Sequence, residues 1–109
     1  MDFKQYQEKA RKTALYPNVG SNFIYPSLGL GGETGEVLEK IKKVMRDSNG
    51  QVTPEIKESL KKEMGDILWY LSALASELGM SLDDIAAANI DKLYSRKDRG
   101  KLQGRGDDR

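Results

Sequence analysis

The chain has 109 residues and a formal net charge of +1, with 32% charged and 38% hydrophobic residues and neither cysteine nor histidine. This length fits one domain with a modest core, and the near-neutral charge gives no bulk field for a nucleic acid polymer or an acidic membrane. Because the chain has no disulfide scaffold, no signal peptide and no apolar run near the ~18 residues of a membrane span, we expect a cytoplasmic protein.

The chain begins with a predicted helix over residues 2–16. Asp2 is suited to cap this helix, with Gln5 as its partner in a capping box. The uncharged segment 16–27 follows, with two prolines and three aromatic residues, and is expected to be a loop because proline disfavours helix at the residue before it. Its aromatic residues either hold the loop against the core or form a wall of a nucleobase pocket, and the sequence favours neither alternative.

Two long helices are predicted over residues 28–47 and 53–78, because apolar side chains recur in both with helical periodicity. The first apolar stripe comprises Leu30, Val37, Ile41, Val44 and Met45, and the second comprises Leu60, Met64, Ile67, Leu71, Leu74 and Leu78. Gly50 ends the first helix, and Thr53 with the proline after it begins the second. The glycine-rich run at 29–32 has neither a Walker pattern nor a preceding strand, so we expect it to permit close helix–helix or helix–metal approach.

A fourth helix is predicted over residues 81–97, opening on the serine of a capping box. Asn89 falls inside its apolar stripe, with Lys92 and Arg96 on the flank of that stripe. Because a buried asparagine must find hydrogen-bond partners, this group is a candidate contact for phosphate or sugar. The alternative is an asparagine bonded to neighbouring backbone.

Capping signals and periodicity agree on an all-α fold with four helices in a bundle-like arrangement and no sheet. Residues 1–97 are expected to form this single domain. Residues 98–109 are polar and glycine-rich, and are expected to form a flexible tail.

Two matching acid-x-Gly-acid tetrads stand in the two long helices, and each places two acids on one helix face beside the apolar stripe. The acids are Glu33 and Glu36 in the first helix and Glu63 and Asp66 in the second. If the stripes pack together, four carboxylates approach one seam, where they repel one another and lose hydration. The alternative is a set of solvated acids paired with lysines, as Glu36 would be with Lys40. The in-phase repetition favours a divalent metal site.

The donor set restricts the metal. Zinc, copper and iron–sulfur sites lack their usual histidine and cysteine ligands here, and a di-iron bundle lacks its Glu-x-x-His pair. An all-oxygen site suits Mg²⁺, with Mn²⁺ as a substitute, and Mg²⁺ usually completes its shell with waters and substrate phosphates. Tyr70 follows Asp66 by one turn on the same side. Its hydroxyl either reaches this site, or the ring is a half-buried edge residue.

The chain also resembles a known family, through the segments GLGGETGEVLEKIKK and KKEMGDILWYLSALASELGMSLDDIAAANIDKL. These are similar to the MazG-type nucleotide pyrophosphohydrolases of the all-α NTP pyrophosphatase superfamily, most clearly over residues 28–97. The resemblance implies that the following residues ligate Mg²⁺: Glu33, Glu36, Glu63 and Asp66. It also implies that Asn89 and Lys92 contact phosphate or sugar, and it matches Tyr70 to an aromatic residue near the site. One position departs from the motif, because Gly32 replaces its leading glutamate.

The resemblance therefore implies hydrolysis of nucleoside triphosphates, with deoxynucleotides foremost, to monophosphate and pyrophosphate, for pool control or housecleaning. Glu36 or Glu33 is expected to orient or deprotonate the attacking water, and Lys92 and Arg96 to hold the leaving pyrophosphate. A homodimer or homotetramer is expected, because aliphatic residues such as Leu38 lie off the main stripes. The alternative is a non-catalytic helical interaction module or a nucleotide sensor.

Overall fold

The computed structural model describes residues 1–107, and these form four α-helices and no strand. The helices are α1 (Phe3–Arg11), α2 (Ile24–Asp47), α3 (Pro54–Glu77) and α4 (Leu82–Asp98). The prediction of an all-α fold with four helices is confirmed. Within the described part of the chain, no helix has both the length and the apolar character needed to cross a membrane.

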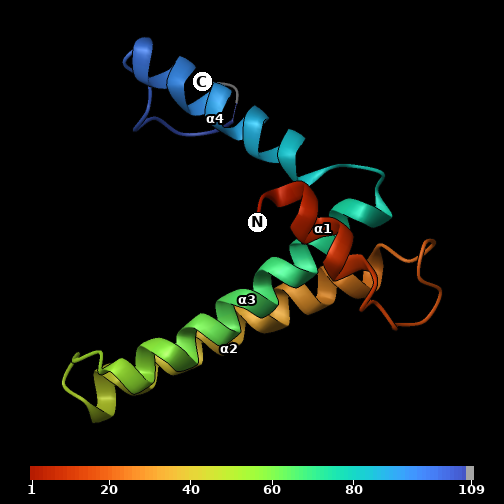
Figure 1. The fold of residues 1–109 in the computed structure, drawn as a ribbon. Coiled ribbons are helices and arrows are strands. Elements are labelled where there is room, and N and C mark those ends of the chain that lie inside the picture. The colour runs from red at the N-terminus through yellow and green to blue at the C-terminus, as the bar shows by residue number, and fades with distance from the viewer. Residues whose placement is uncertain (108–109) are drawn as a thin grey trace.

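A long hairpin of α2 and α3 carries most of the packing between helices (Figure 1). In the turn that joins them, Asn49 and Gly50 adopt left-handed φ angles of 53° and 79°, the conformation that ends a helix. The Thr53 hydroxyl accepts a hydrogen bond of 3.2 Å from the Ile56 N–H, and so caps α3 as the sequence predicts. Local signals therefore set both ends of this turn.

The C-terminal end of α1 and the N-terminal end of α2 differ from the prediction. The first helix stops at Arg11 instead of continuing to residue 16, and α2 begins at Ile24 instead of at residue 28. Pro26 lies in the first turn of α2, where a missing N–H has no helical acceptor to lose. The Asn22 side-chain oxygen accepts from the Tyr25 N–H at 3.0 Å and supports this earlier start.

The last helix does not close a bundle with the other three in the described residues of one chain. After Gly79, whose φ is 69°, α4 rises away from the hairpin and packs chiefly against α1 (Figure 1). The Cα radius of gyration is 16.8 Å, whereas a compact domain of this length has roughly 13 Å. One copy of the chain is therefore extended, and the bundle-like arrangement is not formed within it.

Several large apolar side chains of the hairpin are exposed, and we refer to them together as the exposed apolar strip. Its residues are Leu28, Leu38, Ile41, Met45 and Met64, with exposed fractions from 41% to 71%. Ile41, Met45 and Met64 belong to the stripes predicted to face the core. The two long helices pack mainly on each other, and one helix–helix seam covers less than a full apolar stripe.

Candidate metal centre

The hairpin brings acids of both tetrads together. Glu33 of α2 and Glu63 and Asp66 of α3 each offer one carboxylate oxygen, and these oxygens lie within 4.8 Å of one another. We call these three residues the acid cluster. Oxygen ligands of one octahedral Mg²⁺, each about 2.1 Å from the ion, lie roughly 3–4 Å apart. The donor type of the acid cluster therefore suits a small hard cation, and the 4.8 Å limit on its spacing is slightly wider than one such ion requires.

The carboxylates of the cluster repel one another. The pKa of Glu33 is raised, first by burial and then by the negative charges of Asp66 and Glu63. Glu36, exposed and one turn further along α2, lies outside the cluster but adds to the same effect. Lys40 lies near the cluster, with its Nζ 3.7 Å from Oε1 of Glu63. This lysine thus pairs across the seam, and not with Glu36 as the surface alternative proposed.

Two tyrosines flank the acid cluster. The pKa of Tyr70 is raised by burial, then by Tyr25 and by the charges of Glu33 and Asp66. The pKa of Tyr6, on α1, is raised by burial and by the charge of Asp66. Tyr70 therefore lies near enough to the acids for their charge to act on its hydroxyl, whereas the sequence left its position open between this site and the edge of the core. The sequence did not predict that Tyr6 lies near the acids, because the periodicity of α1 does not indicate which helix it packs against.

The glycine-rich run has two different explanations. A Cβ at Gly29 would overlap the ring of Tyr70, so glycine allows this ring to lie against α2. At Gly31 and Gly32, however, an added Cβ would meet no atom within 4 Å in this structure. Close helix packing thus explains the first glycine only, and among the described residues a Cβ at position 32 would meet no obstacle.

Four aromatic side chains form a continuous group next to the cluster. Tyr16 stacks on Tyr25 with ring centroids 5.0 Å apart and meets the edge of Trp69 at 6.3 Å. Tyr70 lies 5.0 Å from Trp69 and 6.5 Å from Tyr25. Tyr16 is buried, whereas Tyr25 is 43% exposed. The loop is therefore anchored to the core through one tyrosine and presents another to solvent.

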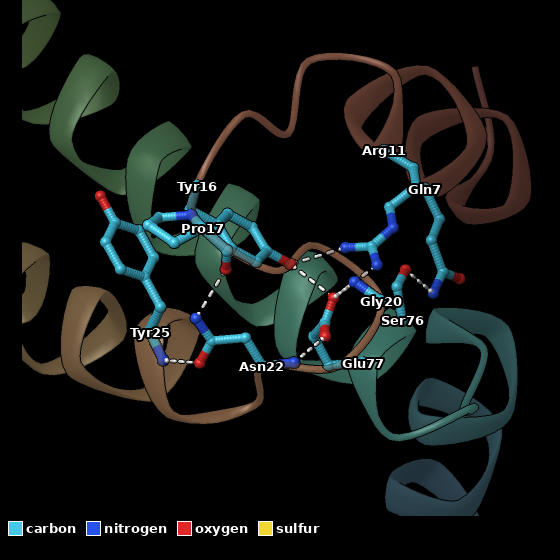
Figure 2. Close-up of polar contacts among 9 residues, drawn as sticks. All are labelled: Gln7, Arg11, Tyr16, Pro17, Gly20, Asn22, Tyr25, Ser76 and Glu77. Carbon is cyan, nitrogen blue, oxygen red and sulfur yellow. Dashed lines mark hydrogen bonds and ion pairs between the residues drawn. The ribbon is translucent and has the colours of Figure 1, made fainter.

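A buried carboxylate at the end of α3 organises this loop (Figure 2). Glu77 accepts hydrogen bonds from Arg11 at 2.5 Å and from the Tyr16 hydroxyl at 2.7 Å. It also accepts from the backbone N–H groups of Gly20 at 2.8 Å and Asn22 at 2.6 Å. Burial raises its pKa, but the hydrogen bonds from Asn22, Arg11, Gly20 and Tyr16 outweigh burial and lower the pKa to about 2.

Glu77 was not among the predicted site residues, although the sequence contains a signal for it. It is the one charged residue between Asp66 and Asp83, in a stretch otherwise made of apolar and small side chains. A charge in such a stretch predicts a buried group that needs several partners. The sequence contains no indication that those partners lie in the loop before α2 and at the end of α1.

The predicted phosphate-contacting residues lie on α4, which rises away from the hairpin in the same chain (Figure 1). Lys92 Nζ is 3.2 Å from a carboxylate oxygen of Asp107. Arg96, only 4% exposed, donates to the backbone oxygens of Asp107 at 2.6 Å and Gly106 at 3.4 Å. Asn89 is exposed, so the expectation of a buried asparagine was wrong, because the hairpin does not cover the α4 stripe. One chain therefore does not bring these residues to the acid cluster.

Comparison with known proteins identifies the family of this chain. The model of the MazG nucleotide pyrophosphohydrolase domain matches residues 27–100, which include both tetrads. Gene 37 protein of Mycobacterium phage L5 is 43% identical over 109 aligned residues, covering 95% of this chain and 96% of the phage protein. YvdC of Bacillus subtilis (strain 168) is 29% identical over 93 residues, covering 85% of this chain and 87% of YvdC. No solved structure gives a significant match. The chain belongs to the MazG nucleotide pyrophosphohydrolase family.

Proposed function

We propose that this protein hydrolyses nucleoside triphosphates, deoxynucleotides among them, to nucleoside monophosphate and pyrophosphate in a Mg²⁺-dependent reaction. The observation that carries the proposal is the meeting of three carboxylate oxygens from two helices within 4.8 Å. Membership of the family implies a pyrophosphohydrolase with a nucleoside triphosphate substrate. The metal and the bond that is cleaved are the specific parts of our proposal.

The acid cluster would hold Mg²⁺, with Mn²⁺ as a substitute. When bound, the metal supplies Lewis-acid stabilisation of the charge that develops on the phosphate oxygens. Glu36 is exposed and outside the cluster, so we assign it the orientation of the attacking water and the acceptance of its proton. The alternative assignment exchanges the two roles. Glu36, one turn after Glu33 on the same helix face, would then be a metal ligand, and Glu33 would orient the water and accept its proton.

Lys92 and Arg96 are proposed to bind the leaving pyrophosphate. Both hold the Asp107 carboxylate, with Lys92 Nζ at 3.2 Å and Arg96 Nη2 at 3.4 Å from the same oxygen. Two cations that bind one carboxylate oxygen are also suited to bind a phosphate oxygen. Asn89 and Lys92 line a cleft of about 350 Å³ beside this pair, which we assign to the substrate.

A homodimer or homotetramer is proposed as the assembled form. The exposed apolar strip of the hairpin is suited to face a second copy, because such a strip costs free energy in water. The separation of α4 from the hairpin leads to a more specific proposal. The α4 of one copy would supply its basic pair to the acid cluster of another.

Pyrophosphate release from a panel of nucleoside and deoxynucleoside triphosphates tests the proposed reaction. Activity should require Mg²⁺ and vanish with a chelator. Glu36→Gln or Asp66→Asn should reduce the rate by ~10³-fold or more, as for loss of a group that stabilises the transition state. A protein that binds nucleotide and Mg²⁺ without releasing pyrophosphate would instead be a nucleotide sensor.

A further inference from the structure

Glu77 does not take part in the reaction proposed above. Its side chain is 0% exposed, which makes it the most buried of the carboxylates that form ion pairs in the described residues. It stands eleven residues beyond Asp66 on α3, which is about 16 Å along a helix. It therefore cannot join the acid cluster as a ligand. Its partners show what it does instead.

Two of the four hydrogen bonds to Glu77 come from backbone N–H groups, those of Gly20 and Asn22. Asn22 in turn donates from its side chain to the Pro17 carbonyl at 2.8 Å and accepts from the Tyr25 N–H at 3.0 Å. Figure 2 shows the Glu77 carboxylate accepting hydrogen bonds both from the loop and from Arg11 of α1. Glu77 thus fixes both the course of the loop and the point where α2 begins.

The same carboxylate also fixes an aromatic stack. The Tyr16 hydroxyl donates to Glu77, and the Tyr16 ring stacks on Tyr25 with an interplanar angle of 14°. Tyr25 keeps a solvent-exposed part and approaches Tyr70, whose pKa is raised in part by Glu33 and Asp66 of the acid cluster. Contacts therefore connect Glu77 with Tyr70 through Tyr16 and Tyr25, and the charges of the acid cluster act on Tyr70.

A flat, partly exposed ring beside a site for phosphates is suited to stack on a nucleobase, because every base offers a π-face. We propose that Glu77 is a positioning residue, which holds Tyr25 through Tyr16 and Asn22 so that Tyr25 stacks on the base of the nucleotide. This inference rests on the proposed function for the identity of the ligand. Glu77 itself touches neither substrate nor metal.

The test compares two ligands that share a polyphosphate and differ in the base. Binding of a non-hydrolysable nucleoside triphosphate and of inorganic tripolyphosphate is measured calorimetrically in Mg²⁺. Glu77→Gln should weaken nucleotide binding about tenfold, the size of one base–aromatic contact, and leave tripolyphosphate binding unchanged. Tyr25→Ala should give the same loss, and adding Glu77→Gln to it should cause no further loss. Glu58→Gln, an exposed change on the same helix, is the matched control.

Tyr16→Phe provides a milder route if Glu77→Gln fails to fold, because it removes only the hydroxyl that Glu77 accepts from. It should weaken nucleotide binding alone, in the same direction. Equal loss for both ligands, or no loss for either in any of these variants, would overturn the inference.

The outcomes also separate this inference from the proposed reaction. Pyrophosphate release by the wild type together with unchanged nucleotide binding in Glu77→Gln would sustain the reaction and reject the positioning role. Base-dependent weakening in Glu77→Gln without turnover by the wild type would sustain the positioning role and reject the reaction. A wild-type protein that binds no nucleotide would contradict both.

Discussion

Lys40 of α2 reaches across the helix seam to Glu63 of α3, with 3.7 Å between Nζ and the nearer carboxylate oxygen. A cation of the protein itself thus stands beside the acid cluster. The pair is only partly buried, with side chains 33% and 21% exposed, so its energy is modest. Lys40 should compete with a bound metal ion, because a fixed positive charge disfavours a second cation on the same carboxylates.

Replacing Lys40 should therefore strengthen metal binding. Lys40→Gln is expected to tighten Mg²⁺ binding by about two- to fivefold, which corresponds to a partly exposed ion pair. Lys42→Gln is the matched control, because Lys42 pairs with Glu39 at 2.9 Å on the exposed face of α2. Calorimetric titration with Mg²⁺ measures both. Equal affinity in the Lys40 variant and the control would show that Lys40 does not compete for the cluster.

The acid cluster should destabilise the metal-free protein at neutral pH. The pKa of Glu33 is raised in the folded state, so its stabilising protonated form is present at low pH and is lost as pH rises through that pKa. Glu33→Gln removes this charge and should raise the metal-free melting temperature at pH 7. Mg²⁺ should raise the melting temperature of the wild type and leave that of Glu33→Gln nearly unchanged. A Mg²⁺ response retained in the variant would contradict the ligand role of Glu33.

Glu77 should have the opposite pH dependence. Its pKa is lowered from 4.5 to about 2, so its contribution is complete above the unfolded value and is lost as pH falls from 4.5 towards 2. At pH 7, Glu77→Gln should cost about 2–3 kcal/mol of unfolding free energy, because buried partners lose a charged acceptor. Urea unfolding at pH 7 and pH 3 should show the wild-type advantage shrinking at the lower pH. A constant difference at both pH values would exclude this account of Glu77.

The proposed sharing of a site between copies predicts complementation. Glu63→Gln removes a cluster acid and Lys92→Ala removes a phosphate contact, so each variant alone should be inactive. Mixed oligomers of the two variants contain sites with a wild-type acid cluster from one copy and a wild-type α4 from another. Such mixtures should regain part of the activity, measured as pyrophosphate release after co-refolding. Mixtures as inactive as their parents would place both halves of the site in the same chain.

The parts of the fold that depend on neighbouring residues were predictable. Thr53 caps α3, Ser81 caps α4 through a 3.0 Å bond from the Asp84 N–H, and Gly79 ends α3 in the left-handed region. Each signal acts within a few residues, so sequence alone locates it. The in-phase tetrads likewise predicted the meeting of Glu33 with the second tetrad, because helical periodicity assigns each acid to a face.

The parts that depend on distant contacts were not predictable. The loop before α2 follows a course set by Glu77, which is 57 residues from Gly20 in sequence. Glu77 also accepts hydrogen bonds next to both helix boundaries that differ from the prediction, from Arg11 at the end of α1 and from Asn22 just before α2. The exposure of Asn89 has a similar cause, because periodicity identifies the apolar stripe of α4 but not the element that covers it.

Hydrolysis in ¹⁸O-labelled water, with Mg²⁺ and a deoxynucleoside triphosphate that the protein turns over, tests the central claim most directly. Attack of water at the α-phosphorus places the label in the nucleoside monophosphate and leaves pyrophosphate unlabelled. Mass spectrometry of the products distinguishes the possible cleavage sites. We predict labelled monophosphate with unlabelled pyrophosphate. Label in free orthophosphate, with nucleoside diphosphate as the other product, would contradict the proposed reaction.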